Sequence, residues 1–343
     1  MLVSLPLVLT LLAASPVQPE TTKPAVAAQP ALPTPPGPGA FFEHAETKVI
    51  GKGYAFTEGP CWLPAKGASK GFFLFCDVPA STVLRWNGGD DTPTPFRTPS
   101  GKALGTAVDA AGNIYFAECE GRQITRVELK EGQPQSPAVL ASKIDGKRLN
   151  ATNDLVVASD GSVFFTDPSF FTAKKDLELE KLASHRIAKD GSITLITDTL
   201  RAPNGIALSL DEKAVFINDF GGGKIVRVGI NPDGSFAAPA TFADLRALAK
   251  AHGLPERGNA DGLRFDADGN IYTTGPGGIL VLSPKGELLA NLPVPGASNL
   301  AFGGEDGKTL IITAGGSVLS IRTTHAGAPW QKPGTAPKPA AAP

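Results

Sequence analysis

Four side chains with oxygen donors recur at the same point of a repeated strand pattern. Each begins an apolar strand and stands nine to thirteen residues before a second strand rich in aromatic and β-branched residues. The four are Glu58 (EGPCW), Asn153 (NDLVV), Asn204 (NGIAL) and Asp261 (DGLRF). Two carboxylates and two amide carbonyls form an all-oxygen donor set of charge −2, which suits a hard divalent cation.

The donor types favour calcium, because a flexible all-oxygen site suits Ca²⁺ better than Mg²⁺. No His or Cys joins the set, which makes zinc less favoured; Zn²⁺, Mg²⁺ and Mn²⁺ stay open as alternatives. Asn and Asp are also common turn residues that bond locally at strand starts. That explanation suits any one of the four, but it explains four at one register less well. We therefore predict that Glu58, Asn153, Asn204 and Asp261 are metal ligands.

The strands that carry these residues form a sixfold repeat. An apolar strand is followed by a turn, most often with Asp and Gly, and then by a second apolar strand. The second strands begin at Gly71, Asn113, Ser162, Ala214, Asn270 and Thr309, with spacings of 42, 49, 52, 56 and 39 residues. Each spacing is typical of one four-stranded propeller blade. The sequence predicts an all-β, six-bladed β-propeller, with one helix at 243–252 inserted between blades.

The first strand of each pair is predicted to be the innermost strand of its blade, which lines the central tunnel. The equivalent positions, which we call the ring positions, are Glu58, Leu104, Asn153, Asn204, Asp261 and Ser298–Asn299. They should form a ring at one depth of the tunnel. Gly59, Gly205 and Gly262 directly follow three of the predicted ligands, and we expect them to let the backbone pass close to a ligand.

Composition divides the chain into one folded region and three flanking segments. Residues 1–15 hold an apolar run of 13 residues, Leu2–Ala14, which is too short to span a bilayer and is typical of a signal peptide. Segments 16–40 and 326–343 are rich in Pro and Ala and are predicted to be a disordered linker and tail. The propeller is predicted over 41–325. We expect a periplasmic or secreted protein whose mature form has no membrane span.

Charge and histidine placement exclude several function classes. The formal net charge is −1, so no electrostatic argument favours nucleic acid or an anionic membrane. No histidine falls at a ring position, so a Ser-His-Asp triad has no evident base. The four histidines are His44, His185, His252 and His325.

Two cysteines flank a predicted hairpin around 66–71. If Trp62 pairs with Phe75, Cys61 faces Cys76 across the two strands. In an exported protein the two could form a disulfide. Two small buried apolar residues are an equally good interpretation.

Five segments resemble the SMP-30/gluconolactonase family of six-bladed propellers. They are EGPCW, GKRLNATNDLVVASDGSVFFTDP, PNGIALSLDE, DGLRFDADGNIYTTG and NLAFGGEDGKTLIIT, within 55–321. The resemblance implies a divalent cation, often calcium, bound by residues matching Glu58, Asn204 and Asp261, with Asn153 touching the metal or the bound substrate. It also implies that Asp261 handles the proton. Leu104 stands where related lactonases often have Asn, a change expected to alter one wall of the pocket and hence the substrate.

The expected activity is metal-dependent hydrolysis of a small lactone, such as the sugar lactone gluconolactone. A bound divalent cation can polarise the carbonyl, and Asp261 is the predicted general base. Asp154 and Asp219 are the next candidates for that role. Arg148, Asn150 and Asn153 are predicted to bind the substrate, although Arg148 could equally be a solvated loop residue.

Two other functions remain compatible with the sequence. One is a non-catalytic propeller, plugged by calcium, that binds a protein or polysaccharide. The other is a related propeller esterase or phosphotriesterase, in which the same four oxygens polarise a different ester. The sequence assigns no oligomeric state.

Overall fold

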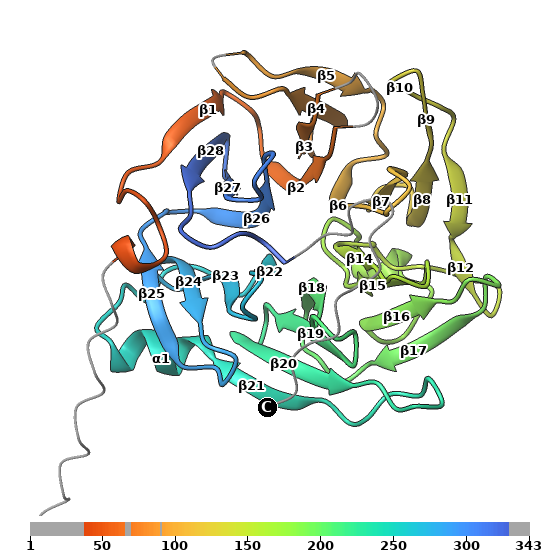
Figure 1. Cartoon of the computed structure of the whole chain (residues 1–343). Helices are drawn as coiled ribbons and strands as arrows, with labels where there is room; N and C mark the ends of the chain where they lie inside the picture. Colours follow the sequence, from red (N-terminus) through yellow and green to blue (C-terminus); the bar gives the residue numbers. More distant parts are fainter. Residues whose placement is uncertain (1–37, 66–69, 90, 329–343) are drawn as a thin grey trace, which may run out of the picture. The chain divides into compact units, whose positions relative to one another are not determined.

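The computed structural model describes residues 38–65, 70–89 and 91–328 of the chain. Within these ranges, six four-stranded antiparallel sheets stand around a common centre (Figure 1), which confirms the predicted all-β, six-bladed propeller. The predicted signal peptide, and nearly all of the two Pro/Ala-rich segments, lie outside the described residues. No helix in the described part of the chain is long and apolar enough to cross a membrane.

Each blade contributes four strands, named below in order from the innermost outward. Blade 1 is β2 (Thr57–Leu63), β3 (Phe72–Asp77), β4 (Thr82–Trp86) and β5 (Thr94–Arg97), and blade 2 is β6 (Ala103–Val108), β7 (Ile114–Glu118), β8 (Gln123–Val127) and β11 (Ala138–Ala141). Blade 3 is β14 (Leu155–Val157), β15 (Val163–Asp167), β16 (Ala183–Ile187) and β17 (Ile193–Thr197), and blade 4 is β18 (Pro203–Leu208), β19 (Ala214–Asp219), β20 (Lys224–Gly229) and β21 (Ala240–Asp244). Blade 5 is β22 (Leu263–Phe265), β23 (Ile271–Gly275), β24 (Gly278–Leu282) and β25 (Leu288–Leu292), and blade 6 is β26 (Ala297–Gly303), β27 (Thr309–Ala314), β28 (Ser317–Arg322) and β1 (Lys48–Lys52).

The remaining elements are short and lie in the connections. They are two-stranded β9 (Leu129–Lys130) with β10 (Gln133–Pro134), two-stranded β12 (Lys143–Ile144) with β13 (Lys147–Arg148), the 3-10 turns η1 (Pro38–Ala40) and η2 (Lys174–Asp176), and helix α1 (Leu245–Ala251). Helix α1 lies between blades 4 and 5, as predicted, and Asp244 caps its first turn by accepting from the Ala247 amide at 2.9 Å. All six predicted second strands are second strands of blades.

Blade 6 contains both ends of the folded chain, which the sequence repeat did not reveal. Its outermost strand, β1, comes from the N-terminal side and pairs antiparallel with β28, with Lys48 opposite Ser320. Strand β1 lacks the repeated Asp-Gly turn and aromatic pattern, so the repeat count missed it. This pairing closes the circle of blades by backbone hydrogen bonds.

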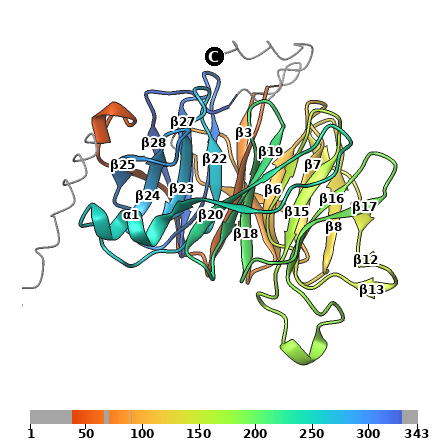
Figure 2. The same cartoon turned by 90° about the horizontal axis from the view of Figure 1, so that it is seen from below.

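The core lies between the blades rather than at the centre of the molecule. Each of six hydrophobic clusters combines buried side chains of two adjacent blades, and together they cover all six junctions. Figure 2 shows the same blades from the side, with their strands standing next to one another. Burial of apolar area between every pair of neighbours therefore holds the circle together.

The predicted pairing of Trp62 with Phe75 is wrong. Trp62 pairs with Phe73, two residues from the predicted partner. A bulge between Glu58 and Cys61 then shifts the register by one more residue, so that Cys76 lies opposite Glu58. Cys61 and Cys76 are both free and buried in the cluster between blades 1 and 2. They act as small apolar core residues.

The innermost strands approach one another so closely that backbone groups bond across every junction. Three glycine amides donate to the next blade: Gly105 to the Asn153 carbonyl (2.6 Å), Gly205 to Asp261 (2.9 Å) and Gly262 to Ser298 (2.9 Å). Hydroxyl groups close the other three junctions: Thr106 donates to the Gly59 carbonyl (2.6 Å), Thr166 to Asn204 (2.7 Å) and Ser298 to Thr57 (2.8 Å). We call this closed set the inner hydrogen-bond ring.

Two glycines show why the approach needs residues without a side chain. A Cβ at Gly205 would collide with the Asp261 carbonyl oxygen, and one at Gly59 with the Leu104 carbonyl oxygen. Gly59 also has a φ of 51°, in the left-handed region. These glycines were expected to make room for a ligand, but the room beside them is taken by the backbone of the next blade.

Replacing Gly205 by Ala should therefore force blades 4 and 5 apart. We expect the Gly205→Ala variant to lose about 2–3 kcal/mol in free energy of unfolding, the usual cost of overpacking a rigid contact. Gly229→Ala is the matched control, because a Cβ there meets only an ordinary contact at 3.5 Å. Denaturant titration of both variants measures the difference, and equal stabilities would contradict the close approach.

Candidate functional site

The ring positions lie together at one end of the innermost strands. Glu58, Asn204 and Asn299 are within the first three residues of β2, β18 and β26. Asn153 and Asp261 lie two residues before the two shortest innermost strands, β14 and β22. Because these strands run in the same direction around one centre, the register predicted from the sequence repeat places these side chains at one depth.

Acidic side chains at the ends of second strands hold the segments that lead into the ring. Asp219 accepts hydrogen bonds from the Arg201 and Ala202 amides at 3.1 and 3.0 Å, just before Asn204. Asp167 does the same for the segment before Asn153, and Asp77 for the segment before Glu58. Asp219, a reserve candidate for the base, is thus occupied as a structural acceptor.

Glu58 is almost completely buried, and one of its carboxylate oxygens is already bonded. Its Oε2 accepts from the Gly59 amide and from Asn299 Nδ2, both at 3.0 Å. Asn299 is held in turn by its own Oδ1, which accepts from the Leu300 amide at 2.9 Å. One edge of the Glu58 carboxylate is fixed by these contacts, which sets the direction of the other edge.

Asp261 is held by its backbone, which leaves its carboxylate for chemistry. Its amide donates to Thr274 Oγ1 at 2.9 Å, and its carbonyl accepts from Asn218 Nδ2 at 2.6 Å as well as from Gly205. The side chain of Asn204 hydrogen-bonds the Asp261 carboxylate. The structure therefore brings Glu58, Asn204 and Asp261 into one electrostatic unit.

Burial and mutual repulsion favour the protonated forms of these two acids. Desolvation raises the pKa of Glu58 to about 7, with Asp154 adding to the rise and the hydrogen bonds from Gly59 and Asn299 opposing it. The pKa of Asp261 lies well above its ordinary value, because of desolvation first and then the charges of Glu58 and Asp154. Carboxylates arranged in this way are stabilised by a cation placed between them.

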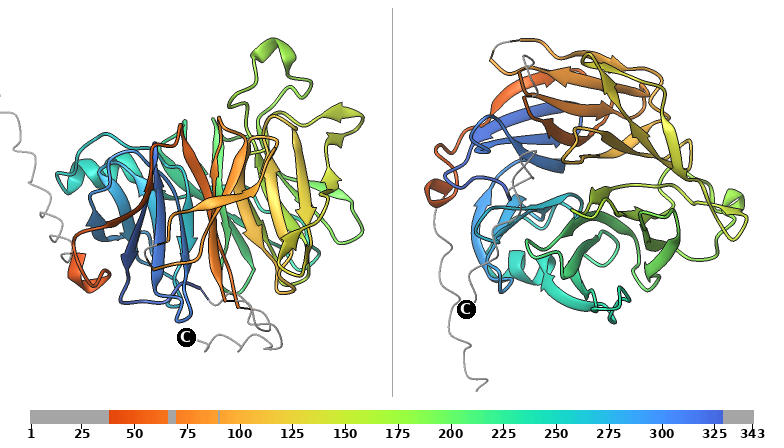
Figure 3. Two further views of the ribbon diagram at one scale, coloured as in Figure 1. Left: turned by 90° about the horizontal axis from the view of Figure 1, so that it is seen from above. Right: turned by 45° about the vertical axis from the view of Figure 1, so that its right-hand side comes forward.

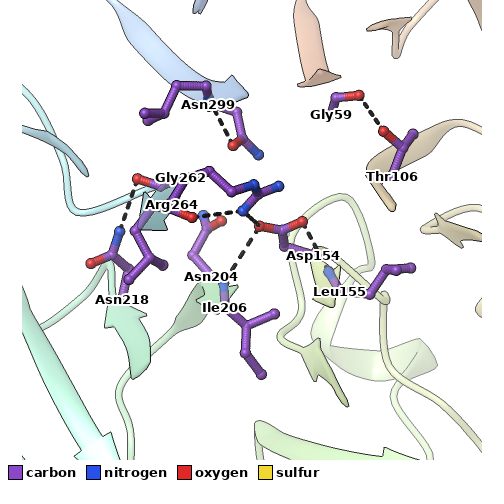
Figure 4. Close-up of polar contacts among 12 residues, drawn as sticks. Gly59, Thr106, Asp154, Leu155, Asn204, Ile206, Asn218, Gly262, Arg264 and Asn299 are labelled. Carbon is purple, nitrogen blue, oxygen red and sulfur yellow. Dashed lines mark hydrogen bonds and ion pairs between the residues drawn. The ribbon is translucent and has the colours of Figure 1, made fainter. Parts of the chain in front are cut away.

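A third carboxylate, that of Asp154, lies under the ring with an arginine beside it (Figure 4). Asp154 Oδ2 accepts from Arg264 Nη1 at 3.3 Å and from the Ile206 amide at 3.4 Å, while Oδ1 accepts from Leu155 at 2.9 Å. Arg264 also donates to the Leu263 carbonyl at 2.7 Å. Arg264 is one cation among three neighbouring carboxylates, of which Glu58 and Asp154 are buried and Asp261 is partly exposed, so the charge of two remains to be compensated.

The donor chemistry fits a hard divalent cation. Within the described ranges, no three His, Cys, Asp or Glu side chains converge closely enough to hold a metal by themselves. Amide oxygens would therefore have to complete the coordination, as Asn204 and Asn153 can. The uncompensated charge of Glu58 and Asp261 matches a divalent ion, and oxygen donors match calcium better than zinc.

The remaining predicted site residues differ in how they are placed. Asn153 is buried at its ring position, with its amide and carbonyl in backbone hydrogen bonds. Asn150 is fully buried, and its Nδ2 donates to the Lys181 carbonyl at 3.0 Å. Arg148 is exposed on β13, and its amide donates to Glu178 Oε2 at 2.8 Å. Leu104 packs into the core between blades 1 and 2 and gives the ring no polar atom.

None of the histidines takes part in the ring, as predicted. His185, on the third strand of blade 3, stacks near Phe165 at 5.5 Å, and burial lowers its pKa to about 4. A hollow of about 560 Å³ also contains no ring residue. It lies between blades 2 and 3 and is lined by residues of the turns at 108–111 and 158–161, at the other end of the inner strands.

Sequence reasoning missed Arg264 and the part played by Asn299. Arg264 reaches Asp154 from a strand two blades away, and the repeat pattern holds no signal for that pair. Asn299 was recognised as a ring position, but its contact with Glu58 depends on the closure of blade 6 against blade 1. Blade 6 is followed by blade 1 in a closed propeller, so the ring positions of these two blades are neighbours. The contact between Asn299 and Glu58 could therefore have been predicted from the sequence.

Comparison with known proteins agrees with this geometry. Residues 56–316 match the SMP-30/Gluconolactonase/LRE-like region. The chain is 30% identical to a gluconolactonase of Zymomonas mobilis over 80% of this chain and 81% of that one, and 29% identical to the lactonase drp35 of Staphylococcus saprophyticus over 66% and 68%. A solved gluconolactonase structure from Xanthomonas campestris superposes with a TM-score of 0.70 at 29% identity, covering 86% of this chain and 99% of that one.

The Arg264 guanidinium should set how strongly the ring attracts a cation. Arg264→Met leaves Asp154 buried without its partner, so the metal-free protein should lose about 2 kcal/mol of stability. Calcium should bind about tenfold more tightly, since a nearby positive charge is gone. Calorimetric calcium titration and thermal unfolding in chelator measure both effects.

Two variants control this prediction. The double variant Asp154→Asn/Arg264→Met removes the whole pair and should regain most of the metal-free stability. Arg186→Met breaks an ion pair of similar length with Asp160 (3.2 Å), which is more exposed and contains no ring residue, and should leave calcium affinity unchanged. Unaltered calcium affinity in Arg264→Met would show that Arg264 does not act on the ring.

Proposed function

Because the chain belongs to the SMP-30/gluconolactonase/LRE-like family, we propose that it is a lactonase, a carboxylic ester hydrolase that opens a small lactone ring. The observation that carries this proposal is the pair of carboxylates of Glu58, which is buried, and Asp261, which is partly exposed, at ring positions shared with Asn204. Such a site combines a place for a divalent cation with a carboxylate able to accept a proton.

We infer that the cation is held by Glu58, Asn153, Asn204 and Asp261, and that calcium is the preferred ion. When bound, it would supply Lewis-acid polarisation of the ester carbonyl and stabilisation of the developing oxyanion. The neutral donors Asn153 and Asn204 keep the total charge of the set at −2, equal and opposite to that of the ion. The fixed edge of Glu58, bonded to Gly59 and Asn299, orients its other oxygen.

Asp261 is proposed as the general base. Its Oδ atoms would accept a proton from the attacking water as the water oxygen bonds to the carbonyl carbon. The ring C–O bond then breaks, and the departing alkoxide takes up a proton to leave a hydroxy acid. Asp261 can do this without moving, because its amide, its carbonyl and the segment before it are all anchored.

Gluconolactone is the first substrate that we propose, by analogy with the relatives. Asn153, at the ring, is the predicted substrate contact that is placed beside the donors. Binding of sugar hydroxyls by Arg148 and Asn150 stays a prediction. The buried Nδ2 of Asn150 is already bonded to main-chain carbonyls, so that binding would need its hydrogen bonds to be exchanged.

Removal of the metal tests the proposal directly. Purified protein should open gluconolactone with calcium present and lose turnover in chelator, while its melting temperature falls by only a few degrees. The six inter-blade clusters do not depend on the ion, whereas a bound ligand adds only its linkage free energy. Activity on a phosphotriester panel but on no lactone would favour the related esterase function instead. Loss of β-sheet circular dichroism on chelation would make the ion a folding element.

A pair of reciprocal substitutions tests the role of Asp261. Asp261→Asn keeps an oxygen donor but removes a charge and the base, whereas Asn204→Asp keeps the donor and adds a charge. At saturating calcium, Asn204→Asp should recover substantial lactonase activity, and Asp261→Asn should stay about 10²–10⁴-fold below wild type. Calcium occupancy is measured in parallel. If saturating calcium restores Asp261→Asn, the base lies elsewhere, with Asp154 the next candidate.

A further inference from the structure

One phenylalanine, Phe171, is unfavourable for folding stability both in its exposure to solvent and in its backbone conformation. Phe171 is 67% exposed, more than any other large apolar side chain in the described residues. Its φ is 65°, in the left-handed region that a bulky side chain adopts only with strain. Neither its backbone nor its side chain therefore helps the chain to fold. A residue kept in this state is a candidate for contact with something outside the chain.

Phe171 lies at the end of the propeller that carries the ring. It belongs to the segment 168–182, which we call the blade 3 lobe and which follows β15 where that strand ends beside the ring. Figure 3 shows the lobe, in green, projecting from one end of the propeller. The next residue, Thr172, donates from Oγ1 to the Asn150 carbonyl at 3.2 Å, three residues before Asn153.

The residue before Phe171 joins the lobe to blade 4. Phe170 packs edge-on against Phe220, with ring centroids 5.3 Å apart. The Phe220 amide donates to the Ala202 carbonyl at 2.9 Å, two residues before Asn204. The aromatic pair thus bridges the segments that lead to Asn153 and Asn204. Both rings are only half-buried, so part of each stays open to a ligand.

The lobe is anchored by a buried arginine. Arg122 Nη1 donates to the Asp176 carbonyl at 3.0 Å, and its Nε bonds the Leu149 carbonyl. Asn150 donates to the Lys181 carbonyl at the far side of the lobe. These contacts restrict the motion of the segment that carries Phe170 and Phe171. Binding of a ligand there therefore costs little conformational entropy, which favours recognition.

We propose that Phe170, Phe171 and Phe220 form an apolar wall beside the ring that receives an alkyl or aryl substituent of the substrate. This inference rests on the proposed lactonase function and narrows its substrate class. The enzyme then favours lactones that carry an apolar substituent over fully hydroxylated sugar lactones. The full burial of Asn150 agrees with this preference, because its amide group is not exposed to a substrate hydroxyl.

The test compares lactones that differ only in the substituent. The substrates are δ-valerolactone, δ-nonalactone (the same ring with a butyl group) and gluconolactone, assayed with calcium. Wild type should have a kcat/KM at least about tenfold higher for δ-nonalactone than for gluconolactone. Phe171→Gly should lose about tenfold on δ-nonalactone and stay within about twofold on δ-valerolactone.

Three further measurements separate recognition from folding. Phe171→Gly relieves the left-handed strain, so its melting temperature should equal or exceed that of wild type. Phe171→Leu should regain part of the δ-nonalactone activity. Leu195→Ser, which removes a 48%-exposed leucine from the outermost strand of the same blade, should change neither ratio. An equal loss on both lactones, a fall in melting temperature or a wild-type preference for gluconolactone overturns the inference.

The experiments separate an error in the proposed lactonase function from an error in the proposed apolar wall. If wild type opens no lactone, the proposed function is wrong, and binding then decides the inference. The ligand for that arm is the butyl-substituted δ-lactam, which is not hydrolysed, titrated calorimetrically into wild type and Phe171→Gly. A dissociation constant about tenfold weaker in the variant supports the wall, and equal constants overturn it.

Discussion

The close approach of the innermost strands is the constraint on which the site depends. Backbone groups bond across all six junctions, and at blades 4 and 5 only glycine leaves room for the contact. This inner hydrogen-bond ring fixes the position of each ring residue along the central tunnel. The main-chain carbonyls of Asn204 and Asp261 accept hydrogen bonds of the inner hydrogen-bond ring, and the side chains of the same two residues belong to the donor set. Structural closure and the donor set are thus properties of the same residues.

The cost of this arrangement is electrostatic. Packing Glu58, Asp154 and Asp261 into a tunnel removes their water, and only Arg264 offsets the charge directly among the described residues. Two of the three acids therefore have raised pKa values, a state that a divalent cation relieves. The hydrophobic clusters between blades are separate from this strain. Substitutions in these clusters can consequently change folding stability without changing the charge of the site.

Much of this was predictable because the repeat is local. The Asp-Gly turns and apolar second strands predicted the blade number, and counting back placed Glu58, Asn204 and Asp261 at one register. Contacts between distant segments carried no such signal. Arg264 reaches Asp154 across two blades, β1 joins blade 6 without the repeated pattern, and Trp62 pairs with Phe73 rather than Phe75. Arg148 and Asn150 were placed by loop position alone, which does not reveal burial.

The pairing of β1 with β28 also determines when the fold can be completed during synthesis. Its partner β28 is the last strand of the described fold to be synthesised, so β1 has no strand partner in blade 6 until β28 has been made. A pairing between segments this far apart is slow, because loop closure precedes any gain in contacts. Until then, blade 6 lacks its outer edge and the circle stays open. The nascent chain therefore has no finished native state to reach before β28 has been made.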